Sequence, residues 1–142
     1  MKALFFSILS LISIALHAQC DLITPLKEEG FENLIQIQED GELQIHYENR
    51  RYRFEGVALK RVFKIIAETP CISDSIRLII YNKGIPVSEV QTKKSLIKGL
   101  FTKALSVKEF NKQSNFSFLA GGTGLSLKGT KERKEMPFII DL

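Results

Sequence analysis

The hydrophobic periodicity of this chain changes between residues 43 and 66, and that change constrains the fold more than any other feature. Leu43, Ile45 and Tyr47 alternate with polar residues, which is typical of a strand with one buried face. Further on, apolar residues recur at the spacing of an α-helix. They are Phe54, Val57, Ala58, Val62, Ile65 and Ile66. The stretch therefore predicts a strand that leads directly into a core helix over residues 54–68.

A short helix and another strand are expected before this stretch. Residues 21–30 have the composition of a short helix that Gly30 ends. Residues 33–38 then alternate between apolar and polar side chains, as a strand does. Asp40 and Gly41 form a dipeptide that is typical of tight hairpins. The expected order is helix, strand, strand, with the two strands antiparallel.

The same order then repeats. After the helix at 54–68, residues 75–81 alternate as a strand, residues 82–84 form a turn, and residues 85–91 return as a strand. Pro86 is typical of an edge strand, because proline cannot donate to a neighbour. One mostly antiparallel sheet with the helices on one face would bury all the apolar residues. The sequence therefore predicts an α+β fold built from two helix–strand–strand units.

Residues 93–142 differ in character from the chain before them. Residues 95–105 have apolar side chains at helical spacing, whereas 121–124 are rich in glycine and 128–135 are mostly charged. We therefore expect one α+β domain over residues 19–92, followed by a helix and a linker-like segment.

The first residues have the features of a secretory signal peptide. Lys2 supplies the positive charge, residues 3–16 are apolar apart from serines, and Ala18 offers a cleavage point. The apolar run is short for a membrane span. We therefore predict that residues 1–18 are a signal peptide and that the chain is exported.

Both cysteines, Cys20 and Cys71, remain after removal of that peptide. Gln19 precedes Cys20, whereas a lipidated cysteine normally follows a small residue, so we interpret Cys20 as an ordinary residue. In an oxidising compartment the two cysteines are candidates for a disulfide, worth about 4 kcal/mol for a loop of this length. The alternative is two thiols that never meet.

The charge of the chain is mildly basic. The formal net charge of +4 includes Lys2, so the expected mature chain carries +3. This balance does not indicate nucleic acid. Acidic polysaccharide and lipid headgroups are the anions that an exported protein meets.

No set of residues with a catalytic pattern is found. His46, the one histidine outside residues 1–18, and the two cysteines cannot form a common closed zinc site. Cys71 and His46 are a conceivable nucleophilic pair, but His46 lies on the polar face of its predicted strand, where we expect it to be solvated. Residues 121–124 lack the lysine of a phosphate-binding loop. We therefore predict a protein that is not an enzyme and has no metal or cofactor.

The clearest basic concentration lies between the predicted strand and helix. Arg50, Arg51, Tyr52 and Arg53 are candidates for contact with a partner or an anionic glycan, because arginine binds anions in a fork and tyrosine stacks on sugars. Basic residues continue along the helix. They are Lys60, Arg61 and Lys64. The alternative is a strand-to-helix junction whose arginines pair with nearby acids or face solvent, with Tyr52 and Phe54 in the core.

Several motifs together resemble a known family. They are Gly-Phe-Glu-Asn at 30–33, Glu-Asn-Arg-Arg-Tyr-Arg at 48–53, Ala-Leu at 58–59 and Gly-Ile-Pro-Val at 84–87. Over residues 21–91 the chain resembles the N-terminal domain of YjbH-like proteins. These are outer-membrane proteins associated with exopolysaccharide or group 4 capsule production. The resemblance implies a location in the periplasm or outer membrane of a Gram-negative bacterium.

The resemblance also implies partners and a larger architecture. Full members of the family carry a C-terminal β-barrel that residues 93–142 are too short to supply, so these residues are expected to be at most the start of a missing barrel. Expected partners are envelope proteins of a polysaccharide export system, anionic polysaccharide, and the outer membrane through such a barrel, but not nucleic acid. Two alternatives remain. One is a general periplasmic adaptor that binds envelope proteins through a sheet edge at 85–91, and the other is a small secreted enzyme that uses Cys71 or His46.

Overall fold

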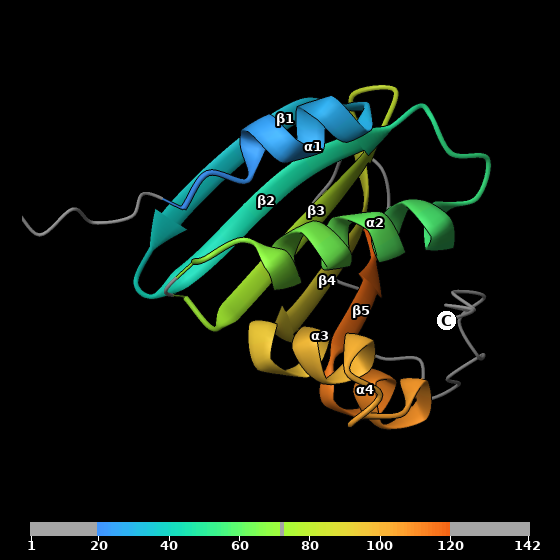
Figure 1. The fold of residues 1–142 in the computed structure, drawn as a ribbon. Helices are drawn as coiled ribbons and strands as arrows, with labels where there is room; N and C mark the ends of the chain where they lie inside the picture. Colours follow the sequence, from blue (N-terminus) through green and yellow to red (C-terminus); the bar gives the residue numbers. More distant parts are fainter. Residues whose placement is uncertain (1–19, 72, 120–142) are drawn as a thin grey trace, which may run out of the picture.

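A five-stranded sheet with helices on one face forms the part of the chain that the computed structural model describes, residues 20–71 and 73–119 (Figure 1). In chain order the elements are α1 (Ile23–Glu29), β1 (Phe31–Glu39), β2 (Glu42–Asn49), α2 (Glu55–Glu68), β3 (Ser75–Asn82), β4 (Ile85–Lys93), α3 (Lys94–Phe101), α4 (Val107–Gln113) and β5 (Asn115–Phe118). The α+β class predicted from the periodicity is therefore confirmed.

The strands lie in the sheet in sequence order, β1-β2-β3-β4-β5. All neighbours are antiparallel except β2 and β3, which are parallel. Parallel neighbours need a long crossover, and α2 supplies it. The two predicted helix–strand–strand units are thus two hairpins joined through a central parallel pair. Both predicted turns are present, and Asp40 and Lys83 adopt positive φ in them together with the glycines that follow.

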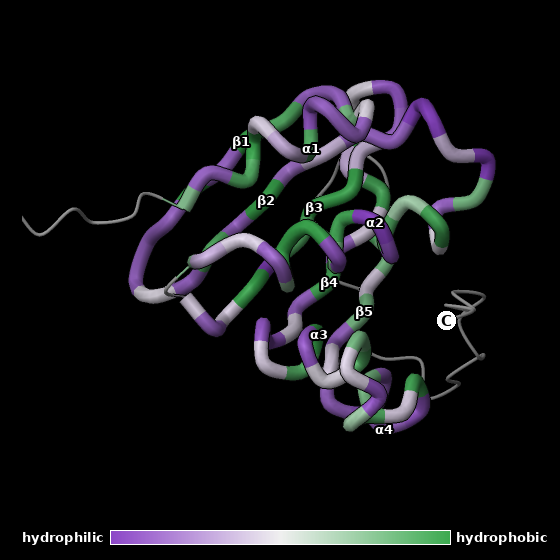
Figure 2. Tube along the Cα trace, viewed as in Figure 1, coloured by the Kyte–Doolittle hydropathy of each residue, from purple (hydrophilic) through white to green (hydrophobic). Residues whose placement is uncertain are grey.

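The core lies between the central strands and α2. Three residues of β2 pair in register with three of β3, Leu43 with Ile76, Ile45 with Leu78 and Tyr47 with Ile80, and all are buried. The α2 residues that cover them share one face of the helix. They are Ala58, Leu59, Val62, Phe63 and Ile66. Figure 2 shows the hydrophobic residues gathered along β2, β3 and α2, whereas the connection from β2 to α2 is mostly hydrophilic.

The prediction that Phe54 and Val57 face the core is wrong. Phe54 is 64% exposed and Val57 is 46% exposed. Phe54 precedes α2 and has extended backbone angles, so its side chain does not belong to the helical stripe. Leu59 and Phe63, which complete the buried face of α2, replace these two residues in the core.

The sheet and core continue past the expected boundary at residue 92. Ile97, Leu100 and Phe110 of α3 and α4 are buried in the same core, and β5 pairs with β4. The predicted edge at 85–91 is therefore wrong, because β4 lies between β3 and β5. Pro86 is tolerated there because the β5 pairing begins only at Ser88.

Other predictions fall outside the described residues. They concern the signal peptide at 1–18 and the linker or barrel segments after residue 119. In the part of the chain that the structure describes, no helix has the length and apolar character to cross a membrane.

Candidate functional site

The basic residues 50–53 lie in the corner between the end of β2 and the start of α2. Glu48 is at the centre of this corner. Its side chain is buried, and each of its carboxylate oxygens accepts two hydrogen bonds. The donors to Oε1 are Arg50 Nε at 3.0 Å and the Lys83 amide at 2.9 Å. Those to Oε2 are Asn33 Nδ2 at 2.6 Å and the Gly84 amide at 3.2 Å. The carboxylate thereby joins β1, β2 and the β3–β4 turn.

These contacts decide the ionisation of Glu48. Burial alone would raise the pKa of its carboxyl group, because it penalises the charged form. The hydrogen bonds from Arg50, Asn33 and the two turn amides outweigh burial and lower the pKa from its usual value. Glu48 is therefore held as an anion, and its charge strengthens the hydrogen bonds that join these segments.

Asn49 shapes the turn that follows. Its Oδ1 accepts from the Tyr52 amide at 2.9 Å, and its Nδ2 donates to the Tyr52 carbonyl at 3.0 Å and to Glu55 Oε2 at 3.1 Å. Glu55 also accepts from the hydroxyl of Tyr47 at 3.0 Å. Burial, and then the Glu55 carboxylate, raise the pKa of the Tyr47 hydroxyl well above its usual value. The first residue of α2 is thus fixed to the end of β2.

Arg50 and Arg51, two of the four candidate contact residues, bind to groups within the chain. Arg50 pairs with Glu48 and, through Nη1, with Glu32 at 3.1 Å. Arg51 Nη1 donates to the Glu29 carbonyl at 2.8 Å, at the end of α1. These arginines therefore pair with nearby acids and carbonyls, as the alternative interpretation of the junction expects.

Tyr52 also packs against the end of α1. Its hydroxyl donates to the Glu29 carboxylate, and its ring lies 6.0 Å from the ring of Phe31. Arg53 places its guanidinium 5.3 Å from the centre of the exposed ring of Phe54. Three of the four candidates thus make contacts within the fold, and the three arginines among the four all remain exposed to solvent.

Three of the four motifs that carry the family resemblance, those at 30–33, 48–53 and 84–87, meet in this corner. Asn33 of the first motif and Gly84 of the last both donate to Glu48 of the middle motif. Gly30 has a φ of 96°, and a Cβ atom there would lie 2.9 Å from Arg51 Cδ. These three motifs are therefore parts of a single contact network.

Cys20 and Cys71 form a disulfide. It joins the chain ahead of α1 to the segment after α2, and buried Lys94 donates from Nζ to the carbonyls of Thr69 and Cys71 in that segment. Burial first, and then the charge of Lys98, lower the pKa of Lys94. Because its sulfur is in the disulfide, Cys71 has no thiol for the conceivable pair with His46.

His46 lies on the face of the sheet opposite the helices. Its Nδ1 is 3.1 Å from the hydroxyl of Tyr81, and its Nε2 is 2.5 Å from the side-chain nitrogen of Gln44. Burial lowers the pKa of this imidazole. The structure therefore does not bring the residues of the proposed nucleophilic pair together. Among residues 20–71 and 73–119, no group of three His, Cys, Asp or Glu could hold a metal ion.

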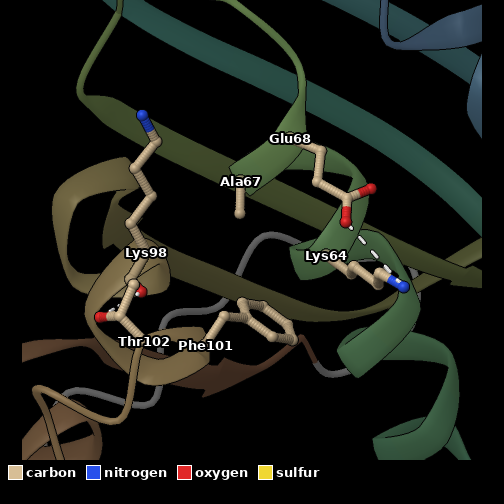
Figure 3. Close-up of a pocket in the computed structure, with 6 residues that line it drawn as sticks. All are labelled: Lys64, Ala67, Glu68, Lys98, Phe101 and Thr102. Carbon is tan, nitrogen blue, oxygen red and sulfur yellow. Dashed lines mark hydrogen bonds and ion pairs between the residues drawn. The ribbon is translucent and has the colours of Figure 1, made fainter.

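A groove of about 260 Å³ lies between α2 and α3 (Figure 3). Its lining residues are Lys64, Ala67, Glu68, Lys98, Phe101 and Thr102. Figure 3 shows the ammonium groups of Lys64 and Lys98 on opposite sides, with Ala67 and Phe101 between them. The sequence indicated Lys64 through the basic run of α2. Lys98 was missed because the helix at 95–105 was recognised only by its apolar residues.

Comparison with protein-family models, curated proteins and solved structures found no match to the chain. The resemblance to YjbH-like proteins therefore rests on the sequence motifs and stays a prediction.

Proposed function

We propose that this chain is an exported, non-enzymatic domain that acts in exopolysaccharide or capsule production or export, as in YjbH-like proteins. It would work by contact with an envelope protein or with the polymer. The observation that carries the proposal is the meeting of the resembling motifs around Glu48. Three motifs that are separate in the sequence thus contribute to one hydrogen-bond network, as a fold shared with that family would require.

The disulfide supports the proposed location. Cys20 and Cys71 are the only cysteines of the sequence, and both are in the bond. Structural disulfides persist in oxidising compartments such as the periplasm and are rare in the cytosol. The bond therefore agrees with the export that residues 1–18 predict.

The contacts within the fold make residues 50–52 and the strand at 85–91 less suitable as a partner-binding surface. Arg50, Arg51 and Tyr52 are engaged within the fold, so mutation of these residues would report on stability as well as on binding. The edge proposed for a general adaptor is already paired with β5. No specific observation favours that alternative over the polysaccharide role.

A deletion strain tests the proposed function. We expect loss of the gene to reduce the secreted or surface-bound polysaccharide, measured as uronic acid and total sugar per cell. The gene supplied in trans, at its natural length, should restore the polymer. Unchanged polymer in the deletion strain, under conditions where the gene is expressed in the parent, would overturn the proposal.

Fractionation tests the location separately. The chain should appear in the periplasmic or outer-membrane fraction, and alkylation before and after reduction should show both cysteines oxidised. Recovery in the cytosol with free thiols would contradict the proposed export.

A further inference from the structure

Charge is unevenly distributed over the described residues. Residues 21–49, which form α1, β1 and β2, contain eight acidic residues and one lysine. Residues 94–113, which form α3 and α4, contain five lysines and one glutamate. In Figure 1 these two parts lie at opposite ends of the domain. An anionic ligand would therefore be attracted to the end that holds α3 and α4.

The groove between α2 and α3 gives this basic end a defined shape. Its two lysines come from different helices, Lys64 from α2 and Lys98 from α3, and they flank the side chains of Ala67 and Phe101. The hydroxyl of Thr102 donates to backbone carbonyls of its own helix. The groove thus offers two cations and the Glu68 carboxylate around an apolar floor.

Both lysines can accept an additional anion. Lys64 Nζ is 3.9 Å from Glu68 Oε1, and both side chains are more than half exposed, so this pair contributes little. Among the described residues, no carboxylate lies within ion-pair distance of Lys98. Buried Lys94 adds positive charge near Lys98.

We propose that the groove between α2 and α3 binds a carboxylate-bearing segment of an anionic polysaccharide. A uronate ring has an apolar face that fits against Phe101 and Ala67, and a carboxylate at its rim that Lys64 or Lys98 would bind. This inference rests on the proposed function and names the ligand class and the surface for it.

A membrane surface fits this region less well. Helices that bind at a bilayer surface insert large apolar residues beside their basic ones. The exposed large apolar residues of the described chain lie elsewhere. They are Ile35, Phe54, Val57, Ile85 and Phe118. None belongs to α3 or α4, so a hydrophilic polymer suits the lysines of this region better than a lipid bilayer.

Binding of polygalacturonate oligosaccharides to the mature chain tests the groove. Lys64→Gln/Lys98→Gln should weaken binding roughly tenfold at low salt, because both cations of the groove are lost. The matched control is Lys108→Gln/Lys112→Gln, which removes the same charge from exposed positions of α4 that do not line the groove. It should stay within about twofold of the wild type. Phe101→Leu should weaken binding without any change of charge.

Each other outcome counts against the inference. Equal losses of affinity in the two double variants would show that the ligand is attracted by net charge and not by the groove. If the wild type does not bind the oligosaccharides, the groove is not a binding site for them. Tighter binding of polyglutamate, or of vesicles containing phosphatidylglycerol, would assign the surface to an acidic peptide or a membrane instead. Circular dichroism and thermal unfolding of each variant would exclude misfolding. If the groove fails while the deletion strain still loses its polymer, the proposed function stands without this site.

Discussion

Asn33 donates a 2.6 Å hydrogen bond to the buried carboxylate of Glu48, and this contact joins the first strand of the sheet to the second where their register shifts. Asn33 has a φ of 51°, a conformation that asparagine adopts more readily than most residues. Its backbone and its side chain therefore both favour asparagine. The same carboxylate accepts from the β3–β4 turn, so one buried charge fixes three segments.

Replacement of this charge should destabilise the domain. Glu48→Gln keeps the shape of the side chain but loses the charge and places an amide where two donors converge. We expect the midpoint of thermal unfolding to fall by about 5 °C or more. Glu32→Gln is the matched control, because Glu32 also pairs with Arg50 but is about half exposed. It should change the midpoint little, and equal effects of the two substitutions would contradict the central role of Glu48.

The contribution of Glu48 should also depend on pH with a definite sign. Its pKa is lowered in the folded chain, so its ionisation stabilises the fold above the ordinary pKa of 4.5 and this stabilisation is lost as pH falls further. The difference in urea stability between the wild type and Glu48→Gln should be full at pH 6 and shrink towards pH 3. A difference that grew on acidification would show that the pKa is raised instead.

Gly30 should tolerate substitution less well than another glycine with positive φ. Gly30→Ala forces φ = 96° on an alanine and places its Cβ 2.9 Å from Arg51 Cδ, so we expect a loss of about 2 kcal/mol in the free energy of unfolding. Gly41→Ala has a similar backbone conflict, at φ = 78°, but nothing within 4 Å of the new Cβ. It should cost about 1 kcal/mol in urea unfolding. In an Arg51→Ala background, the losses of unfolding free energy caused by Gly30→Ala and Gly41→Ala should become more similar. If the difference between them persists, the backbone conformation alone causes it.

The sequence predicted most of the sheet because its central strands repeat apolar residues with a period of two. Residues 43–47 and 76–80 carry an apolar side chain at every second position, and both strands lie where that pattern predicts them. β5 was missed because it has only four residues, and its place in the sheet depends on pairing with β4, from which α3 and α4 separate it in the sequence. The roles of Arg50 and Arg51 also depend on distant segments. Sequence alone could not choose between an anion-binding arginine and one that pairs with Glu32 or with the end of α1.

Phe54 and Phe63 allow a direct comparison of an exposed and a buried phenylalanine. Phe63 is buried and packs edge-on against Phe110 at 5.5 Å, whereas Phe54 is 64% exposed. Phe63→Ala should cost about 3–5 kcal/mol of unfolding free energy, because it leaves a cavity in the core. Phe54→Ala should change stability by no more than about 0.5 kcal/mol. Chemical denaturation of both variants measures these changes in unfolding free energy. A large loss of stability in Phe54→Ala would show that Phe54 packs in the core, as its sequence spacing predicts.

The disulfide should be a main source of stability, because it closes a long loop. Cys20 and Cys71 are 51 residues apart, and cross-linking a loop of this length restricts the unfolded chain by about 4 kcal/mol. Reduction of the wild type should therefore lower its urea midpoint substantially. Cys20→Ser/Cys71→Ser should have the lower midpoint from the start and should not respond to reductant, which makes it the control for other effects of the reagent. If the oxidised and reduced wild type unfolded at the same urea concentration, the native packing around Leu22 and Lys94 would already hold the two segments together without the bond.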